Sequence, residues 1–246
     1  MCRQLGYLGP ARSVGDVLTA GTSSLMQQSW APRDMRGGGT VNADGFGAAW
    51  WTDDGVGLYR NPMPIWTDPA VTDTLTSVRS TAVLAAIRSA TVGMPVDRSA
   101  CAPFVAGRWA FGHNGVVTGW PHSLADLVAD VPAVDLLRLP APTDAATLWV
   151  LLQHRLTRQE PGEAVAGLVR DVDAAAPGSR LNLLLGDGRT LWATAVHHAL
   201  SVRADGESVT VASEPTDDDD PAWRPVPDRS IVTAAVGVLD ITPLDR

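Results

Sequence analysis

The chain contains no lysine, and all 19 of its basic residues are arginine. Schiff-base chemistry on a lysine amine is therefore excluded, and so is a phosphate-binding loop that depends on lysine. The 27 acidic residues give a net charge of −8, and the arginines are scattered singly along the sequence. Because nucleic-acid backbones are bound by clustered positive charge, the sequence predicts no nucleic-acid partner.

Cysteine is also scarce, and long apolar runs are missing. The two cysteines are Cys2 and Cys101, and a disulfide between them is not expected in a reducing compartment. No stretch approaches the roughly 20 consecutive apolar residues of a membrane span, and the N-terminus lacks the features of a signal peptide. We expect a soluble, cytoplasmic protein with no membrane partner. A length of 246 residues suits a single domain over 1–246, and the sequence leaves open whether the chain forms a homo-oligomer.

The histidines do not point to a metal. There are five, and they lack the spacing of a zinc site. His197 and His198 are adjacent, and on a strand their side chains would point to opposite faces. The sequence therefore predicts no metal site and no bound cofactor.

Glycine, proline and aspartate divide the chain into short elements. The patterns predict strands over 3–8, 46–51, 82–88, 109–117, 181–185, 190–196 and 208–211. They predict helices over 69–78, 123–129, 144–156 and 163–175. The clearest helix is 144–156, where Thr143 or Asp144 can cap a segment with leucines at helical spacing. Because two helices follow one another and hairpins follow them, the order favours an antiparallel α+β layered fold over an alternating α/β fold.

Cys2 directly follows the initiator methionine. Its side chain is small, so we expect removal of Met1, which leaves a thiol and a free α-amine on the same residue. An α-amine has a pKa of about 7.7 to 8.0, so it can take the thiol proton and later pass it to a leaving amine. A lone cysteine at this position is more often chance, and its importance depends on the motifs that follow it.

Several of these motifs occur in a fixed order along the chain. They are Cys2-Arg3, Asn42-Ala43-Asp44-Gly45-Phe46-Gly47, Ile87-Arg88-Ser89-Ala90-Thr91, Pro103-Phe104, His113-Asn114-Gly115, Thr143-Asp144 and Ser213-Glu214-Pro215. Together they resemble the class II glutamine amidotransferases, a family of N-terminal nucleophile hydrolases. The resemblance implies a four-layer αββα fold, with two antiparallel sheets between helical layers, and a Cys2 thioester in the reaction.

The oxyanion of such a reaction needs hydrogen-bond donors. Asn114 offers a side-chain amide and Gly115 an unobstructed backbone N–H, and we expect a sharp turn at the end of a strand to aim both at one point. The competing interpretation is an ordinary Asn-Gly hairpin turn. The oxyanion role is favoured because Cys2 and Arg88 are also present.

The resemblance also implies a site for the glutamyl group. Arg88 corresponds to the residue that binds its α-carboxylate, and a guanidinium suits that fork. Asp144 corresponds to the partner of its ammonium, although an acid at a helix N-terminus is a common cap. We expect one carboxylate oxygen to cap the helix and the other to accept from the ammonium. The family's usual Thr-His-Pro-Phe is Cys101-Ala102-Pro103-Phe104 here, and we interpret Cys101 as structural.

Three further segments resemble one branch of this family, the amidohydrolases of ergothioneine biosynthesis, which remove a γ-glutamyl group from γ-glutamyl-hercynylcysteine sulfoxide. They are 29–33 (SWAPR), 64–68 (PIWTD) and 222–227 (AWRPVP). The leaving group of that substrate carries a trimethylammonium, which aromatic faces can bind. We expect Trp30 or Arg33 to border the substrate pocket on the side away from Arg88.

The sequence leaves three alternatives to this amidohydrolase. The first alternative is a glutaminase subunit that delivers ammonia to a synthase partner. The second is a hydrolase of other γ-glutamyl peptides, and the third is a binding protein with a decayed site. The last is the weakest, since each residue that the chemistry needs is present.

Overall fold

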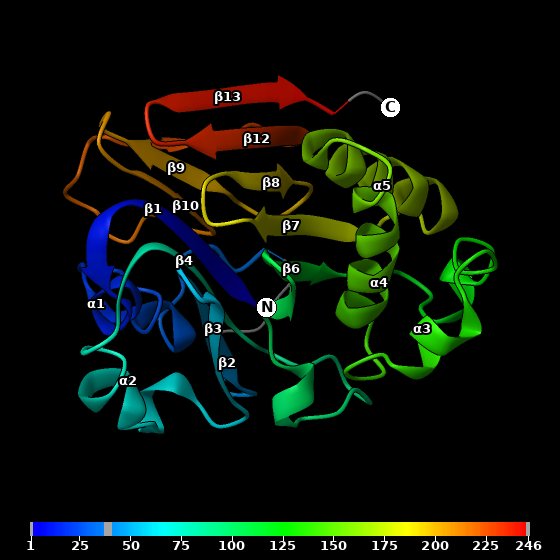
Figure 1. The fold of residues 1–246 in the computed structure, drawn as a ribbon, viewed down its shortest axis with the longest axis horizontal. Helices are drawn as coiled ribbons and strands as arrows, with labels where there is room; N and C mark the ends of the chain where they lie inside the picture. The colour runs from blue at the N-terminus through cyan, green and yellow to red at the C-terminus, as the bar shows by residue number, and fades with distance from the viewer. Residues whose placement is uncertain (1, 37–40, 245–246) are drawn as a thin grey trace.

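The computed structural model describes residues 2–36 and 41–244, and its strands form two antiparallel sheets (Figure 1). Sheet A runs in the order β11 (Trp223–Pro225), β9 (Ser201–Ala204), β10 (Val209–Ala212), β1 (Arg3–Ser13), β4 (Arg79–Ile87), β2 (Phe46–Thr52) and β3 (Gly55–Asn61). Sheet B runs in the order β13 (Val238–Pro243), β12 (Ser230–Ala235), β8 (Leu191–Ala195), β7 (Arg180–Gly186), β6 (Trp109–Val116) and β5 (Phe104–Ala106).

The helices are few and mostly short. They are α1 (Val14–Thr19), α2 (Ala70–Asp73), α3 (Ala133–Leu137), α4 (Asp144–Leu156) and α5 (Pro161–Ala175), with short 3-10 helices at Gln27–Ser29, Ile65–Thr67, Arg98–Ala100 and His122–Leu124. No helix in the described residues is long and apolar enough to cross a lipid bilayer.

Three hydrophobic cores separate four layers, because side chains alternate between the two faces of each strand. Along β4, Leu84 packs between the sheets, whereas Val83 and Ala85 pack against Leu18 of α1. Along β7, Leu184 joins the core between the sheets, and its neighbours face the core under α4 and α5. The layers are therefore helices, sheet A, sheet B and helices, which confirms the predicted αββα arrangement.

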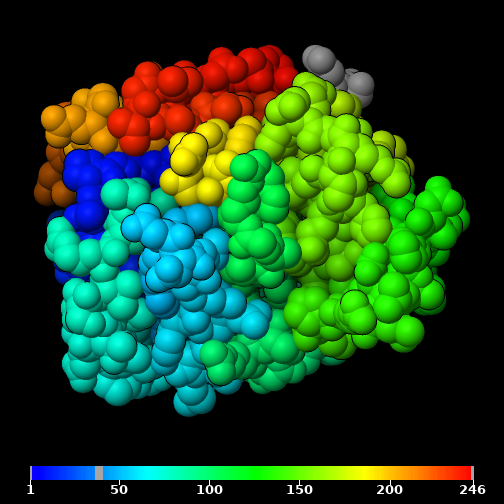
Figure 2. Space-filling model, in the orientation of Figure 1, coloured from blue at the N-terminus to red at the C-terminus, as the bar shows by residue number. Residues whose placement is uncertain are grey.

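In the space-filling view, the N-terminal third (blue to cyan) and the helical region (green) occupy opposite sides of the visible face and meet along its middle (Figure 2).

Helix α4 begins and ends as the sequence predicts. The Thr143 hydroxyl accepts a hydrogen bond from the backbone N–H of Ala146 at 3.2 Å, which caps the first turn. Leu148 and Leu152, one turn apart, are both fully buried against sheet B. The cap fixes Asp144 as the first residue of the helix.

Two of the predicted helices are wrong in extent. Within 69–78 only Ala70–Asp73 is α-helical, and three threonines at 72, 74 and 76 lower the helix propensity of that segment. Within 123–129 the chain forms turns after the 3-10 helix His122–Leu124. Several strands that were not predicted, among them β3 and the β12–β13 hairpin, lie at or next to a sheet edge.

Candidate active site

Cys2 lies immediately before β1, in the interior of sheet A. The neighbouring strand β4 runs antiparallel and ends at Ile87, so the segment that follows it comes beside Cys2. The Cys2 thiol donates a hydrogen bond to the carbonyl of Ser89, with 3.6 Å between sulfur and oxygen. The predicted removal of Met1 concerns a residue outside the described ones.

Several of the predicted site residues line one cavity at this end of the sheets. Cys2 and Arg88 come from sheet A, Gly115 from sheet B, and Asp144 from the start of α4. His113 and Thr143 also line it. The fold thus gathers in one cavity a thiol, a guanidinium and a carboxylate from segments far apart in the sequence.

Arg88 is held by its backbone, and most of its guanidinium is left open. Its N–H donates to the carbonyl of Gly45 at 2.8 Å, and its carbonyl accepts from the N–H of Asp44 at 3.0 Å. The side chain makes one hydrogen bond within the described residues, from Nη1 to the carbonyl of Pro95 at 2.8 Å. The other donors of this half-buried guanidinium are available to a ligand.

Gly45 cannot carry a side chain in this loop. Its φ is +112°, and a Cβ there would lie 2.4 Å from the sulfur of Cys101. The Cys101 thiol is fully buried and donates to the carbonyls of Asn61 and Asp97. Burial raises the pKa of Cys101 to about 11, so this thiol stays protonated near neutral pH. A buried, protonated thiol is unreactive, which agrees with a structural role for Cys101.

The Asp144 carboxylate is buried and already accepts two backbone hydrogen bonds. Oδ2 accepts from the N–H of Val117 at 2.9 Å, and Oδ1 accepts from the N–H of Ala145 at 2.8 Å. Oδ1 thus accepts from the first turn of the helix, and Oδ2, which we predict to accept from the ammonium, already accepts from Val117. An ammonium would use the remaining lone pairs of the two oxygens.

Asn114 and Gly115 lie within β6, where they pair with Asn182 and Leu181 of β7. The expected sharp turn at these residues is thus wrong, and so is the hairpin-turn alternative, because both residues continue the ladder. A Cβ on Gly115 would lie 1.8 Å from the carbonyl oxygen of Arg180, so only glycine fits there. The neighbouring strand, rather than a turn, makes glycine necessary.

Because side chains alternate along a strand, the Asn114 side chain points to the face of β6 opposite that of Gly115. It is 1% exposed there. Its Nδ2 donates to the hydroxyl oxygen of Ser213 at 3.3 Å, and its Oδ1 is buried without a hydrogen-bond partner. The Ser213 hydroxyl also accepts from the N–H of Gln4 at 3.0 Å. The end of β10 therefore fixes the position of Asn114 relative to the start of β1.

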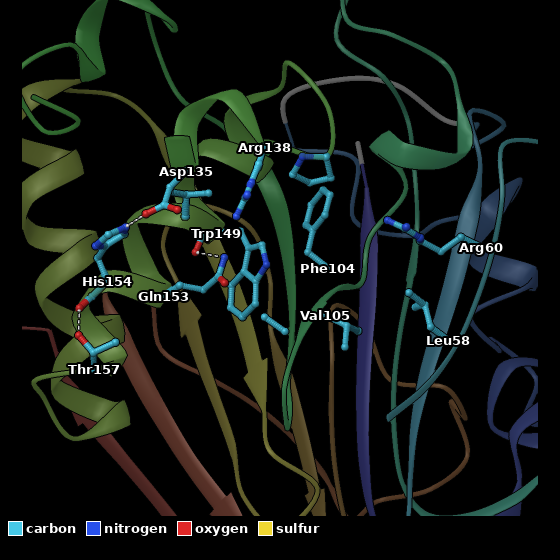
Figure 3. Close-up of a pocket in the computed structure, with 13 residues that line it drawn as sticks. Leu58, Arg60, Phe104, Val105, Asp135, Arg138, Trp149, Gln153, His154 and Thr157 are labelled. Carbon is cyan, nitrogen blue, oxygen red and sulfur yellow. Dashed lines mark hydrogen bonds and ion pairs between the residues drawn. The ribbon is translucent and has the colours of Figure 1, made fainter. Parts of the chain in front are cut away.

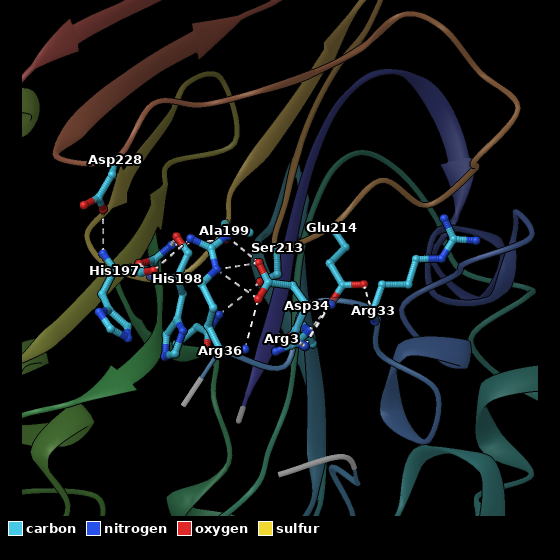
Figure 4. A network of polar contacts seen from close by, with 12 residues as sticks. Arg3, Arg33, Asp34, Arg36, His197, His198, Ala199, Ser213, Glu214 and Asp228 are labelled. Atoms are coloured by element: carbon cyan, nitrogen blue, oxygen red, sulfur yellow. Dashed lines mark hydrogen bonds and ion pairs between the residues drawn. The ribbon is translucent and has the colours of Figure 1, made fainter. Parts of the chain in front are cut away.

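A polar network around Arg3, Asp34 and Glu214 lies next to Cys2 in the chain (Figure 4). Arg3 is 1% exposed; its Nε donates to Oε1 of Glu214 at 2.8 Å and its Nη1 donates to the carbonyl of Cys2 at 3.0 Å. Glu214 also accepts from the backbone N–H groups of Arg33 and Asp34 at 2.9 and 3.2 Å. Neither Arg3 nor Glu214 was given a role from the sequence, although both stand in the ordered motifs.

Trp30 and Arg33 do not line the cavity of Cys2. Trp30 is 41% exposed and packs edge to face with Trp66, with ring centroids 5.6 Å apart. The guanidinium of Arg33 forms an ion pair with Asp218. Through the hydrogen bond from Arg33 to Glu214, this loop is joined to the network around Cys2.

His197 and His198 lie beyond the end of β8, as they do beyond the predicted strand 190–196. His197 has a φ of +80°, which turns the chain away from the sheet. His198 is 3% exposed, and burial lowers its pKa to about 3. No group of three or more metal-ligating side chains occurs among residues 2–36 and 41–244.

Solved structures share this fold. A glutamine aminotransferase class-II domain protein from Silicibacter pomeroyi matches with a TM-score of 0.69 at 23% identity, covering 99% of this chain and 100% of that chain. The glutamine phosphoribosylpyrophosphate amidotransferase of B. subtilis matches with a TM-score of 0.67 at 13% identity, covering 99% of this chain and 49% of that chain. The fold is that of the N-terminal nucleophile hydrolases.

The sequence comparisons define the family. The model of the class II glutamine amidotransferases matches residues 19–219. The gamma-glutamyl-hercynylcysteine sulfoxide hydrolase of Mycolicibacterium smegmatis is 37% identical over 246 residues, which cover 99% of this chain and 100% of that protein. The chain belongs to the class II glutamine amidotransferase family.

Proposed function

We propose that this chain hydrolyses the γ-glutamyl amide of γ-glutamyl-hercynylcysteine sulfoxide to glutamate and hercynylcysteine sulfoxide, a step of ergothioneine biosynthesis. The observation that carries the proposal is that Cys2, Arg88 and Asp144 line one cavity. The full-length similarity to a hydrolase named for this substrate supports the choice of substrate. Residues 1–246 act as a single domain, since the cavity takes residues from both sheets and from α4.

The first half of the reaction forms a thioester. After removal of Met1, the α-amine of Cys2 takes the thiol proton, and the sulfur attacks the γ-carbonyl carbon. Asn114 and Gly115 donate to the oxyanion, for which Asn114 needs its amide N–H directed toward the carbonyl oxygen. The α-ammonium then gives its proton to the leaving nitrogen, the C–N bond breaks, and the amine product departs.

The second half releases glutamate. The α-amine takes a proton from water, and the hydroxide oxygen attacks the thioester carbon. The C–S bond breaks, and the sulfur regains its proton from the ammonium. Cys2 returns to its starting state, so the cycle consumes one water and requires no cofactor and no metal.

Arg88 and Asp144 hold the glutamyl group during both steps. The open donors of Arg88 bind the α-carboxylate, and Asp144 accepts from the α-ammonium. Anchoring the far end of the glutamyl chain places its carbonyl within reach of the thiol. Trp30 lies outside the cavity of Cys2, and its exposed ring would meet the part of the leaving group that extends beyond this cavity, on the side away from Arg88.

A thiol nucleophile with a second free cysteine suits a reducing compartment, and we place the reaction in the cytoplasm. The substrate is a small molecule, so neither nucleic acid nor membrane takes part.

The N-terminus gives the sharpest test. An uncleavable extension ahead of Cys2 should abolish turnover and leave the unfolding transition unchanged, because it converts the α-amine into an amide. Cys2→Ala should also lose covalent labelling by an electrophilic glutamine analogue, as followed by intact mass. Turnover by the extended protein at the rate of the processed protein would refute the assignment of the base.

The family also contains glutaminases that supply ammonia, and this alternative has its own measurement. Ammonia release from glutamine that rises sharply when a second protein is added would identify an amidotransferase subunit. Turnover of other γ-glutamyl peptides at rates above that of the hercynyl conjugate would instead identify a broader peptide hydrolase.

A further inference from the structure

A second cavity, of about 540 Å³, lies where β5 and β3 face α3 and α4 (Figure 3). β5 and β3 are the edge strands of sheets B and A. Cys2, Arg88 and Asp144 do not line this cavity. Its volume lies within the range of about 300 to 1,000 Å³ that small-molecule sites occupy. The cavity is therefore large enough for a ligand of its own.

Two arginines extend toward this cavity from different walls, and neither has a carboxylate partner within the described residues (Figure 3). Arg60, on β3, donates from Nη1 to the carbonyls of Ser99 and Cys101 at 3.5 and 3.3 Å. Its Nε is buried with no hydrogen-bond partner, and burial lowers the pKa of Arg60. Arg138, which follows α3, is exposed, and no ion pair or side-chain hydrogen bond holds it in the described part of the chain.

Six other arginines among the described residues are neutralised by the protein itself. Ion pairs with aspartate or glutamate hold Arg3, Arg33, Arg36, Arg155, Arg203 and Arg229. Asp135 is the one carboxylate among the described residues that line the cavity, and it is bonded to Nε2 of His154 at 3.0 Å. No lining carboxylate pairs with Arg60 or Arg138, so within this cavity the positive charge of both side chains is open to a ligand.

The remaining walls are largely apolar. Leu58, Phe104, Val105 and Trp149 line the cavity, and Gln153 adds a side-chain amide. A simple inorganic ion would leave these apolar surfaces in contact with water, whereas a flat organic molecule would cover them. We infer that this cavity binds an organic anion, with a carboxylate between Arg60 and Arg138 and an apolar or aromatic body against Phe104 and Leu58.

Phe104 also lines the cavity of Cys2 and is 2% exposed. It is the first residue of β5 and pairs with Phe111 of β6, the strand that carries Asn114 and Gly115. A ligand packed on Phe104 therefore touches a side chain that also bounds the catalytic cavity. The inference that the second cavity binds an organic anion does not depend on the proposed function.

Calorimetric titration with 1-naphthoate tests the inference. We expect saturable one-to-one binding by the wild type, at least about 10-fold weaker binding by Arg138→Gln and by Arg60→Gln, and no change in Arg158→Gln. Arg158 is an exposed arginine just after α4 that does not line the cavity, so it is the matched control. Two arginine variants are used so that the result stands if one of them fails to fold.

Further titrations test which part of the ligand is recognised and which cavity holds it. The neutral 1-naphthamide should bind at least about 10-fold more weakly than 1-naphthoate, and inorganic phosphate should bind more weakly still. Equal binding of the amide would overturn the role of the arginines, and equal binding of phosphate would overturn the apolar body. The Arg88→Lys and Cys2→Ala variants should bind 1-naphthoate like the wild type. Loss of binding in either variant would place the ligand in the catalytic cavity, and absence of binding by the wild type would refute the site.

Discussion

Arg3 and Arg88 both lie beside Cys2, Arg3 next to it in the chain and Arg88 across the sheet. They differ in burial and in how many of their guanidinium donors the protein itself uses. Arg3 is 1% exposed and bonded to the Glu214 carboxylate, to the carbonyl of Cys2 and to the carbonyl of Asp34. Arg88 is half-buried, lines the catalytic cavity and makes a single side-chain hydrogen bond, to the carbonyl of Pro95.

This difference distinguishes an arginine that positions the protein's own groups from one that can bind a substrate. A guanidinium whose donors are used by the protein is part of the framework, and one with free donors in a cavity can bind a substrate. Arg3 fixes the backbone at Cys2 through its carbonyl, so it acts on the position of the nucleophile. We therefore expect substitutions around Arg3 to affect mainly stability and those around Arg88 to affect mainly kinetics.

The largest expected effect is the loss of stability when the carboxylate partner of Arg3 is removed. Glu214→Gln leaves the buried guanidinium without its charge partner, and we expect the free energy of unfolding to fall by about 3–5 kcal/mol. Chemical denaturation measures this. The matched control is Asp218→Asn, which breaks the exposed ion pair with Arg33 and should cost no more than about 1 kcal/mol. Equal losses in the two variants would show that the Arg3 pair is not a framework contact.

The second largest expected effect is that of Asn114→Ala on kcat. Loss of one oxyanion donor should lower kcat by about 10²–10³-fold, or about 2.7–4 kcal/mol of transition-state stabilisation, with little change in KM. Steady-state kinetics on a γ-glutamyl amide gives both constants. A change in KM alone would contradict the oxyanion role of Asn114.

Arg88→Lys tests the open arginine directly. Lysine keeps the charge but loses the planar fork, so we expect KM to rise and kcat to fall, with kcat/KM lower by about 10- to 100-fold. The free energy of unfolding should stay within about 0.5 kcal/mol of wild type, because few protein contacts are lost. A large loss of stability with unchanged kinetics would assign Arg88 to the framework instead.

The smallest expected effect is at Trp30. Removing an exposed aromatic face from a quaternary ammonium should cost about 0.5–1 kcal/mol, so Trp30→Ala should lower kcat/KM for the hercynyl conjugate by about 2- to 5-fold. Turnover of glutamine, which lacks the trimethylammonium, is the control and should not change. An equal loss on both substrates would show that Trp30 only packs against Trp66.

Much of the local structure could be predicted from the sequence. Helix α4 follows the predicted 144–156, and β2 and β6 differ from their predicted ranges by one residue at one end. These elements have a clear periodicity, and α4 also has a clear cap at Thr143. Strand β3 and the β12–β13 hairpin were missed, because part of each is exposed and the strand pattern there is weak.

The sequence by itself determined the candidate nucleophile, the residues that recur in family order and the layered α+β class, because these depend on residue identity and local pattern. Tertiary structure decided what each polar side chain contacts. Glu214 reaches Arg3 across 211 residues, and Ser213 reaches Asn114 across 99. Both contacts depend on β10 lying beside β1 and on sheet A facing sheet B. Strand order and sheet stacking arise from long-range packing, which local propensity does not encode.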